Sequence, residues 1–503
     1  MGTISRWRIA AVALAAGSLV GSGVGVAPQS QAAAVPNSVQ VTPSATSGAV
    51  PVVIPKHKNG RLVFAHYHPS FPTSLDNLPA AQDYYQTEYL NPKGEGGKWA
   101  KTGGYLRDRP VAVAPKGGDF RLANAKKEIA DAKAAGIDGF ALNFGCVKSS
   151  APGTPCYGQW AAQRAIFTAA AQMNFKIILQ PDMNTDLGKM SQATFASAIA
   201  TMAKNKAVYK RGGKVVITPF LTERRSASWW KGALAKLKAK KVKVYFMPQF
   251  LQLKAVRTSK TKAAWDKIAS GYSEWGGRTP SVDKSPVSAL HKAKKIWMHP
   301  VAVQDARPKE GGYWEAANSA TLRATWMSAI KSKADLVMLL TWNDYSEGTS
   351  FAPSLRHGYS LLDLNSYYLS WYRTGKAPKI ANETLFISHR VHSYKLKPSL
   401  GYAVQMKPLQ KSKPRDTIEV VTMLKKPATV RVVVGSTLYA SYTAKAGVYV
   451  RVIALRTGLI TAQLARSGTI MARASTGEPV VSSRPVQDMD YRFASSRRPV
   501  PRI

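Results

Sequence analysis

Short apolar runs alternate with amphipathic segments eight times between Arg61 and Tyr372, and this alternation constrains the fold more than any other feature of the chain. Each apolar run has the length of a buried strand, and the segment that follows carries apolar residues at helical spacing. The predicted strands are residues 61–66, 139–143, 176–180, 214–218, 243–247, 270–274, 296–300 and 336–341. Eight strand–helix units in about 320 residues predict a (β/α)₈ TIM barrel of the α/β class.

Local signals support this interpretation. Asp119 stands where a helix cap is expected, and Gly136 is placed to end the same helix. Further helices are predicted at residues 160–174, from about 191, and at 226–240, 262–269, 286–294 and 365–372, with one more around residues 322–330. A doubly wound open sheet is the alternative fold, but no glycine-rich phosphate loop follows the first strand.

The pattern changes after Pro378. Short strand-like runs at residues 385–387, 417–421, 430–434 and 448–453 are separated by Gly, Lys and Pro turns without a helix between them. We therefore expect residues 59–379 to form the barrel and residues 380–482 to form an antiparallel β-sandwich domain. Residues 483–503 are expected to form an edge strand and a frayed basic tail.

The first 34 residues have the pattern of a cleaved export signal. Arg6 and Arg8 precede an apolar stretch at residues 9–20, and Ala32–Ala34 offers a small-residue cleavage site. A retained membrane anchor is the alternative, although glycines dilute the apolar stretch. No later segment is long and apolar enough to span a membrane. We expect a secreted, extracellular protein whose residues 35–58 form a linker.

The expected secretion guides the interpretation of the two cysteines and of the net charge. Cys146 and Cys156 bracket a short loop, and in an oxidising compartment they are expected to form a disulfide. The chain has 71 Lys and Arg residues against 28 Asp and Glu residues, a net charge of +43. Such an excess favours association with polyanions such as anionic cell-wall polymers.

Active-site side chains of a (β/α)₈ barrel project from the carboxyl ends of the strands. In this chain those positions carry acids, amides and aromatic residues. The expected site residues are His66, Tyr67, Asn143, Asp182, Gln249, Glu274, Trp275, His299, Gln304, Asp305, Trp342, Asn343, Asp344, Tyr345 and Glu347. Aromatic rings stack on sugar faces, and paired carboxyls supply an acid and a base, so the mixture predicts a polysaccharide-cleaving site.

Four of these residues are predicted to be catalytic. We expect Asp182 and Glu274 to be the reacting pair, with Asp305 and Glu347 as the next candidates. An inverting mechanism requires two carboxyls about 6.5–9.5 Å apart. Other roles stay open: Asp182 as a helix cap, Asp344 as a brace for its loop, and His66 and His299 as core residues.

Other chemistries lack their motifs. The histidines do not have the spacing of a zinc site, no Gly-x-Ser-x-Gly elbow is present, and the basic residues form no recognised nucleic-acid motif. The sequence therefore predicts no metal, no cofactor and no specific nucleic-acid partner.

Three segments resemble glycoside hydrolase family 71, the endo-α-1,3-glucanases or mutanases. Val63–Tyr67 and Ala134–Asn143 are similar to the family's first and second barrel strands, and Leu340–Glu347 (LTWNDYSE) is similar to its Thr-Trp-Asn-Asp signature. Residues 83–85, 107–110 and 303–305 look like features of bacterial members. The resemblance spans about residues 60–380.

The resemblance implies a secreted barrel enzyme with an appended β-domain that cleaves α-1,3-glucan with inversion and without a metal. By position it places Asn143 and Asp182 in the substrate site, and Glu274 in the region of the sixth strand. Asp344 and Glu347 belong to the signature of the eighth strand.

Alternative functions remain open at this stage. Fungal members tend to carry an acid after the fifth strand, where this chain has Gln249 and Gln252. A non-catalytic glycan- or cell-wall-binding barrel is therefore a second hypothesis. A third is a polyanion-binding adhesin in which the Lys and Arg residues of the β-domain dominate. The eighth-strand segment is also similar to the Trp-Asn-Glu-x-x-Glu-Gly pattern of family 99 endo-mannan hydrolases, whose activity is an alternative.

Overall fold

The computed structural model describes residues 50–55, 60–148, 155–282, 284–410, 413–498 and 500. The predicted signal peptide lies outside the described residues, as does most of the predicted linker. Residues 50–55 of that linker pack against the folded body, because Val52 is buried and pairs with Ile380. The linker prediction was wrong for this stretch. Within the described part of the chain, no helix has the length and hydropathy needed to cross a membrane.

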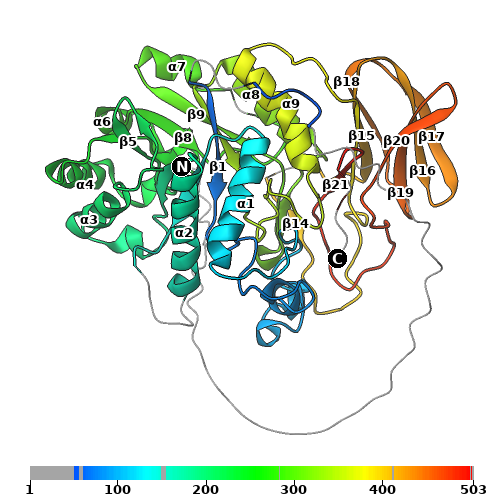
Figure 1. Cartoon of the computed structure of the whole chain (residues 1–503), viewed down its shortest axis with the longest axis horizontal. Helices are drawn as coiled ribbons and strands as arrows, with labels where there is room; N and C mark the ends of the chain where they lie inside the picture. The colour runs from blue at the N-terminus through cyan, green and yellow to red at the C-terminus, as the bar shows by residue number, and fades with distance from the viewer. Residues whose placement is uncertain are drawn as a thin grey trace, which may run out of the picture. The chain divides into compact units, whose positions relative to one another are not determined.

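A ten-stranded sheet organises residues 62–340 (Figure 1). Its strands are β1 (Leu62–Tyr67), β2 (Gly139–Phe144), β3 (Lys176–Pro181), β4 (Lys210–Arg211), β5 (Lys214–Ile217), β6 (Val244–Phe246), β7 (Gln249–Phe250), β8 (Gly271–Glu274), β9 (Ile296–Ala302) and β12 (Leu336–Leu340). Each of the eight predicted strands overlaps one of these, and apart from the β4–β5 hairpin all pairs are parallel.

The sheet is curled, and the segment from Val244 to Phe250 has a strand on each side. Its first part, β6, pairs with β5, and its second part, β7, pairs with β8. Met247 N donates to Ile217 O at 2.9 Å, while Ser273 N donates to Pro248 O at 3.0 Å. The remaining order runs from β5 through β3, β2, β1, β12 and β9 to β8.

Helices follow the strands as the sequence predicts. They are α1 (Phe120–Ala134), α2 (Pro155–Gln172), α3 (Gln192–Met202), α4 (Ala227–Ala239), α5 (Leu253–Val256), α6 (Lys262–Ile268), α7 (Val287–Lys292), α8 (Ala320–Ser332) and α9 (Ser360–Thr374). Short turns are η1 (Tyr85–Tyr89), η2 (Glu95–Gly97), η3 (Ala100–Thr102), η4 (Asp186–Lys189), η5 (Thr222–Arg224) and η6 (Pro308–Glu310). Asp119 accepts a hydrogen bond from Leu122 N, which confirms the predicted cap of α1.

Helix α9 begins five residues before the predicted start. The sequence there includes Asp363, which looks like an exposed position. In the structure Asp363 is buried and forms an ion pair with Arg498, so the first turn of α9 is buried as well. Arg498, from near the end of the chain, thus provides the counter-charge for a buried acid of this helix.

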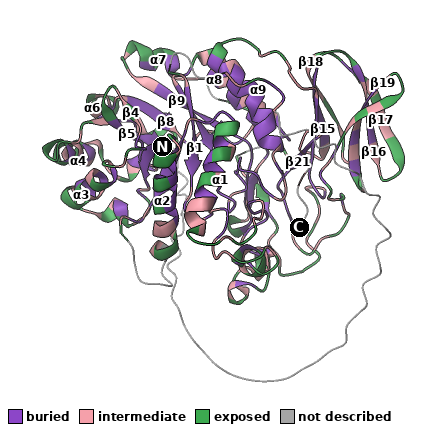
Figure 2. Ribbon diagram, viewed as in Figure 1, coloured by how far each residue is buried: buried purple, intermediate pink, exposed green. Residues whose placement is uncertain are grey.

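Strand residues alternate between two apolar clusters, because successive side chains point to opposite faces of a sheet. One cluster lies on the inner face of the curled sheet and includes Phe64, Ile178 and Met338. The other lies between the sheet and the helices and includes Val63 and Ile177. Figure 2 shows the strands of the curled sheet mostly buried and the outward faces of the helices around it exposed.

After α9 the chain forms two four-stranded antiparallel sheets. The first contains β13 (Thr384–His389), β15 (Thr417–Leu424), β18 (Gly447–Ala454) and β21 (Arg492–Ser495), and the second contains β16 (Ala428–Val434), β17 (Thr437–Ala444), β19 (Ile460–Arg466) and β20 (Thr469–Ser475). Both sheets contribute to one apolar cluster, with Leu385 and Ile418 from the first and Val430 and Leu464 from the second. Strands β17, β19 and β20 are absent from the prediction because their Thr, Ser and Ala residues form no apolar run.

The edge strand predicted after residue 483 is β21, which pairs with β13 at the edge of the first sheet. Residues 487–495 are buried, so this stretch is not part of a frayed tail. Asp488 and Arg492 form an ion pair inside this segment. Charged residues that looked exposed in the sequence are thus satisfied inside the fold.

A third small sheet lies beside the site described below. It contains β10 (Asp305–Arg307), β11 (Gly312–Trp314) and β14 (Lys407–Pro408). The β10–β11 hairpin is antiparallel. The hairpin determines where the side chains of Asp305 and Arg307 point, and this orientation could not be predicted from the sequence alone.

Candidate active site

The predicted site residues separate according to the face of the sheet on which they lie. His66, Gln249 and Trp275 continue the inner-face positions of their strands. The His66 and Trp275 rings meet edge to face, with centroids 5.1 Å apart. Gln249 Oε1 accepts a hydrogen bond of 2.7 Å from Gln180 Nε2. Gln180 lies two residues after Ile178 on β3 and therefore also belongs to the inner face. Burial lowers the pKa of His66 to about 3, so this ring is neutral near pH 7.

Four predicted residues lie elsewhere, and the prediction of their roles needs correction. Tyr67 packs on Phe140 between the sheet and the helices. His299 Nδ1 lies 3.0 Å from Trp297 Nε1, and burial lowers the pKa of His299 to about 4. Neither residue continues an inner-face position, because the strand alternation turns both side chains towards the helices.

Glu274 and Trp342 are the other two. Glu274 is one residue before the inward Trp275, and its Oε2 accepts a hydrogen bond of 2.9 Å from Leu253 N. It is therefore directed towards α5. The Trp342 ring is fully buried, and its Nε1 donates to Glu128 Oε2 at 3.1 Å. A sugar cannot stack on a ring with no exposed face.

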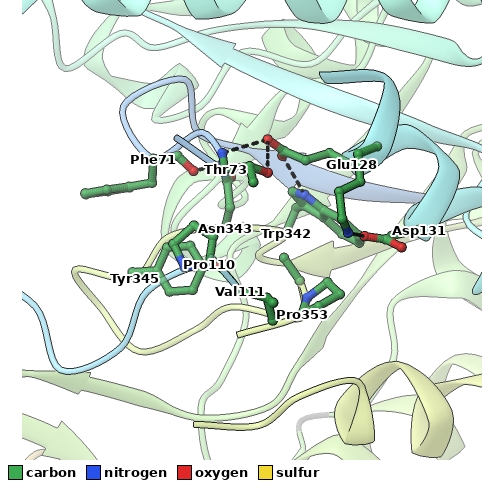
Figure 3. A pocket seen from close by; sticks show the side chains of 12 residues that line it. Phe71, Thr73, Pro110, Val111, Glu128, Asp131, Trp342, Asn343, Tyr345 and Pro353 are labelled. Atoms are coloured by element: carbon green, nitrogen blue, oxygen red, sulfur yellow. Dashed lines mark hydrogen bonds and ion pairs between the residues drawn. The ribbon is translucent and has the colours of Figure 1, made fainter. Parts of the chain in front are cut away.

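Glu128 of α1 is a buried acid that the sequence did not indicate. It borders a small cavity with Phe71, Pro110 and Tyr345 among its lining residues, and Figure 3 shows its carboxylate directed at Thr73 and Trp342. Thr73 donates to it twice, from N and from Oγ1, each at 2.9 Å. Burial raises the pKa of Glu128. These donors hold the carboxylate in place, which favours a structural role.

The loop after β12 brings two carboxylates together with the loop after β1. Asn343 Oδ1 accepts a hydrogen bond of 2.7 Å from His68 N, and Asn343 Nδ2 donates to His68 O at 3.0 Å. Tyr345 is buried in an aromatic cluster with Phe71. Asn343 and Tyr345 join the two loops that carry His68, Asp344 and Glu347, and both also line the small cavity beside Glu128, so their role in substrate binding stays a prediction.

Asp344 is buried and is held as a carboxylate. Its Oδ1 accepts hydrogen bonds from Ser346 N at 3.0 Å and from Ser346 Oγ at 2.7 Å. Burial opposes ionisation, but the charges of His68 and Lys309 and the hydroxyl of Ser346 keep the pKa of Asp344 below its ordinary value. Asp344 is thus suited to act as a base or a nucleophile.

Glu347 has the opposite electrostatic setting. Burial raises its pKa to about 8, and the nearby charges of Asp344 and Asp305 add to that rise, while Arg307 opposes it. Arg307 donates a hydrogen bond of 2.8 Å to Glu347 Oε2. At neutral pH most of this carboxyl is therefore protonated, which is the state that a general acid needs.

Asp305 supports Glu347 and is not free to react. It is fully buried and accepts two hydrogen bonds from Arg307, at 2.7 and 2.9 Å. A second guanidinium, that of Arg278, lies 3.4 Å away. Gln304 next to it accepts a hydrogen bond of 2.9 Å from Tyr491 N. Asp305 positions Arg307, and Gln304 joins the site to the C-terminal segment.

Asp182 and Asn143 lie beside this group. Asp182 Oδ1 accepts a hydrogen bond of 2.8 Å from Asn184 N, and Thr185 is the residue that caps η4. Burial raises the pKa of Asp182, against the effects of Asn184, His68 and Asn143. Asp182 therefore lies near His68, within the same electrostatic group as Asp344.

Some residues of the site were missing from the sequence prediction. Lys309 and Arg307 come from the segment of β10 and η6, and Tyr105 comes from the long connection between β1 and α1. Lys309 Nζ lies 5.4 Å from the centre of the Tyr105 ring and 3.5 Å from Ser346 Oγ. None of the three directly follows a strand of the curled sheet, so the rule that site residues lie at strand ends could not find them.

The predicted disulfide between Cys146 and Cys156 is present, and it joins the end of the segment after β2 to α2. Among the described residues, no group of three or more His, Cys, Asp and Glu side chains could hold a metal ion.

Comparisons with known proteins identify the family of the chain. The model of glycosyl hydrolase family 71 matches residues 114–494. The ascus wall endo-1,3-alpha-glucanase of Schizosaccharomyces pombe is 22% identical over 431 residues, covering 75% of this chain and 94% of that protein. Mutanase Pc12g07500 of Penicillium rubens is 24% identical, covering 73% of this chain and 83% of that protein.

Among solved structures, the chain is similar to the GH99 endo-alpha-mannosidase of Bacteroides thetaiotaomicron, with a TM-score of 0.43 and 12% identity, covering 64% of this chain and 99% of that chain. The family model spans most of the sheet, the loop after β12 and the C-terminal sheets. The chain therefore belongs to glycosyl hydrolase family 71 and is a glycoside hydrolase.

Proposed function

We propose that this enzyme cleaves α-1,3-glucan with Asp344 and Glu347 as the reacting pair. The observation that carries the proposal is the opposite electrostatic setting of the two carboxyls in one loop: the pKa of Asp344 is lowered and that of Glu347 is raised to about 8. Two neighbouring carboxyls with separated pKa values are the usual arrangement for an acid and a base in one site. The proposal replaces the predicted pair of Asp182 and Glu274.

The proposed reaction has one displacement step. Glu347 gives its proton to the glycosidic oxygen as the bond to the anomeric carbon breaks, and the leaving chain departs as an alcohol. Asp344 removes a proton from a water molecule, which attacks the anomeric carbon from the opposite face and inverts it. Asp182, Asn143 and Trp275 are proposed to bind the sugar rings.

The substrate proposal rests on the relatives. Three similar proteins are named as α-1,3-glucanases or mutanases, at 22–25% identity. We further propose endo-action, and secretion directed by the N-terminal segment. The association with anionic wall polymers stays a prediction.

We also propose that the eight parallel strands close into a (β/α)₈ barrel. Supporting this, the segment Val244–Phe250 hydrogen-bonds to β5 on one side and to β8 on the other. A closed ring would bring the loops after β1, β3, β8 and β12 to one rim, as a polysaccharide site requires.

The test is an incubation of the purified chain with α-1,3-glucan, α-mannan and dextran, followed by analysis of soluble oligosaccharides. Release from α-1,3-glucan alone is the expected result, and release from α-mannan would instead favour an endo-mannan hydrolase. Proton NMR of the first products distinguishes β-configured reducing ends, expected for inversion, from α-configured ends, which would contradict it.

A further inference from the structure

The cationic residues of the chain are distributed unevenly. Between Leu187 and Trp265 the sequence contains eighteen Lys and Arg residues and a single acid, Glu223. This stretch forms α3, the β4–β5 hairpin, α4, β6, β7 and α5. This stretch of 79 residues thus carries a net charge of +17 out of the +43 of the whole chain, a higher density of positive charge than the chain has on average.

Many of these cations lie where the chain enters the strands. We define the lysine face as Lys204, Lys206, Lys210, Arg211, Lys214, Lys240, Lys241 and Lys243. Its seven lysines are exposed and Arg211 is half-buried. All eight come from the connections before β5 and β6, so they lie at the amino ends of the strands, opposite the loops of the active site.

Strand pairing brings several of these charges close together. Arg211 and Lys214 are register partners across the β4–β5 hairpin. Lys243 O accepts a hydrogen bond of 2.8 Å from Val215 N, so Lys243 lies beside Lys214 on the neighbouring strand. Paired strands are about 4.8 Å apart. Like charges at that separation destabilise a sheet.

Nothing in the described part of the chain neutralises this face, since none of its eight side chains forms an ion pair with an acid there. The carbonyl end of α4 accounts for Lys240 and Lys241, because cations there are stabilised by the helix dipole. No such effect applies to Lys210, Lys214 and Lys243 at the strand starts. An external anion would relieve their mutual repulsion.

We propose that the lysine face binds a linear polymer of repeating phosphate groups, of the polyol-phosphate kind. Lysine ammonium groups bind phosphates as point charges and need no fixed geometry. None of the exposed large apolar side chains of the described residues belongs to the face. The nearest aromatic residues, Tyr209 and Tyr245, are half-buried against the inner-face cluster, and Arg211 lies over the Tyr245 ring. The face therefore offers no fully exposed ring on which nucleic-acid bases stack and no exposed apolar residue that enters a membrane.

This surface is separate from the proposed catalysis. The loops that carry Asp344 and Glu347 lie at the other ends of the strands, so a bound phosphate polymer leaves them uncovered. Binding at the lysine face holds the enzyme on a phosphate-rich surface while the opposite end acts on glucan.

The experiment compares two variants of the full chain that lose four exposed lysines each. The first carries Lys→Gln changes at four positions of the lysine face, namely Lys206, Lys210, Lys214 and Lys243. The matched control carries Lys→Gln changes in or near the C-terminal sheets, namely Lys407, Lys425, Lys426 and Lys445. Binding to fluorescent polyglycerol phosphate is measured from 0.05 to about 0.3 M salt, where exposed charges become screened.

We expect the lysine-face variant to bind at least tenfold more weakly at about 0.1 M salt and to show a smaller dependence of affinity on salt, because fewer counterions are released. The control is expected to stay within twofold of the wild type. Equal losses in both variants, or tighter binding of the wild type to duplex DNA or to anionic vesicles than to polyglycerol phosphate, would overturn the proposal. Thermal melting of both variants shows that they are folded, and the binding assay needs no glucan, so its outcome is independent of the proposed activity.

Discussion

Arg307 donates a hydrogen bond of 2.8 Å to Glu347, and yet burial together with Asp344 and Asp305 raises the pKa of that glutamate to about 8. The guanidinium is shared, since it also makes two hydrogen bonds to Asp305. Asp305 thereby takes up much of the positive charge that would otherwise ionise Glu347. A buried cation can therefore hold a general acid in position without removing its proton.

Substitution of Glu347 by Gln is expected to lower kcat on α-1,3-glucan by about 10²–10⁴-fold, because the leaving oxygen loses its proton donor. An α-glucosyl fluoride needs little help from an acid, so the variant should keep most of its activity on such a substrate. The Asp344→Asn variant should lose activity on both substrates. Equal losses of Glu347→Gln on both substrates would remove Glu347 from the role of the acid.

The Glu274→Gln variant serves as the matched carboxyl-to-amide control. Glu274 accepts a hydrogen bond from Leu253 N at the start of α5 and lies outside the inner face of the sheet. We expect its kcat on glucan to stay within about threefold of the wild type, since the amide oxygen can accept the same hydrogen bond. A loss as large as that of Glu347→Gln would restore Glu274 to the reacting pair.

The pH dependence follows from the two carboxyls. The rate requires ionised Asp344 and protonated Glu347, so kcat/KM, which reports the free enzyme, should fall as the pH rises through about 8. Arg307 lowers the pKa of Glu347. The Arg307→Gln variant should therefore move the alkaline limb of the pH–rate profile to higher pH. This shift is expected independently of any change in the maximal rate. An unchanged or lower alkaline limb would show that Arg307 does not act on the titrating group.

Asp490 lies against the loop of the site and offers a test of stability. A side chain at Gly348 would come within 2.6 Å of Asp490 Oδ1, and burial raises the pKa of Asp490 to about 7. A raised carboxyl pKa means that stability falls as the pH rises from about 4, the pKa of an unfolded Asp, to about 7.

The Asp490→Asn variant removes that ionisation. Its melting temperature should exceed that of the wild type at pH 8, by about 1 °C for each kcal/mol recovered in a folded body of this size, and the difference should shrink at pH 5. Calorimetry of the two proteins at pH 8 and at pH 5 measures the difference in melting temperature at each pH. A variant that is less stable at pH 8 than the wild type would show that the Asp490 carboxylate forms a stabilising contact.

Much of the fold could be predicted from local sequence. The eight apolar runs overlap eight parallel strands of the sheet, and Asp119 caps the helix that it was predicted to cap. These features depend on residues close together in the chain, such as an apolar run or a side chain that reaches an amide three residues away. The disulfide between Cys146 and Cys156 is of the same local kind.

Only the tertiary structure decided which strand-end residues meet. Trp275 lies on the inner face of the sheet and Glu274 beside it does not, because one residue of register reverses the face. Arg307 contacts Glu347 and Lys309 contacts Ser346, in each case from another loop. The spacing of residues along the chain does not predict such contacts. Burial then separates the pKa values of Asp344 and Glu347, and burial is a property of the folded chain, since water surrounds the same carboxyls when the chain is unfolded.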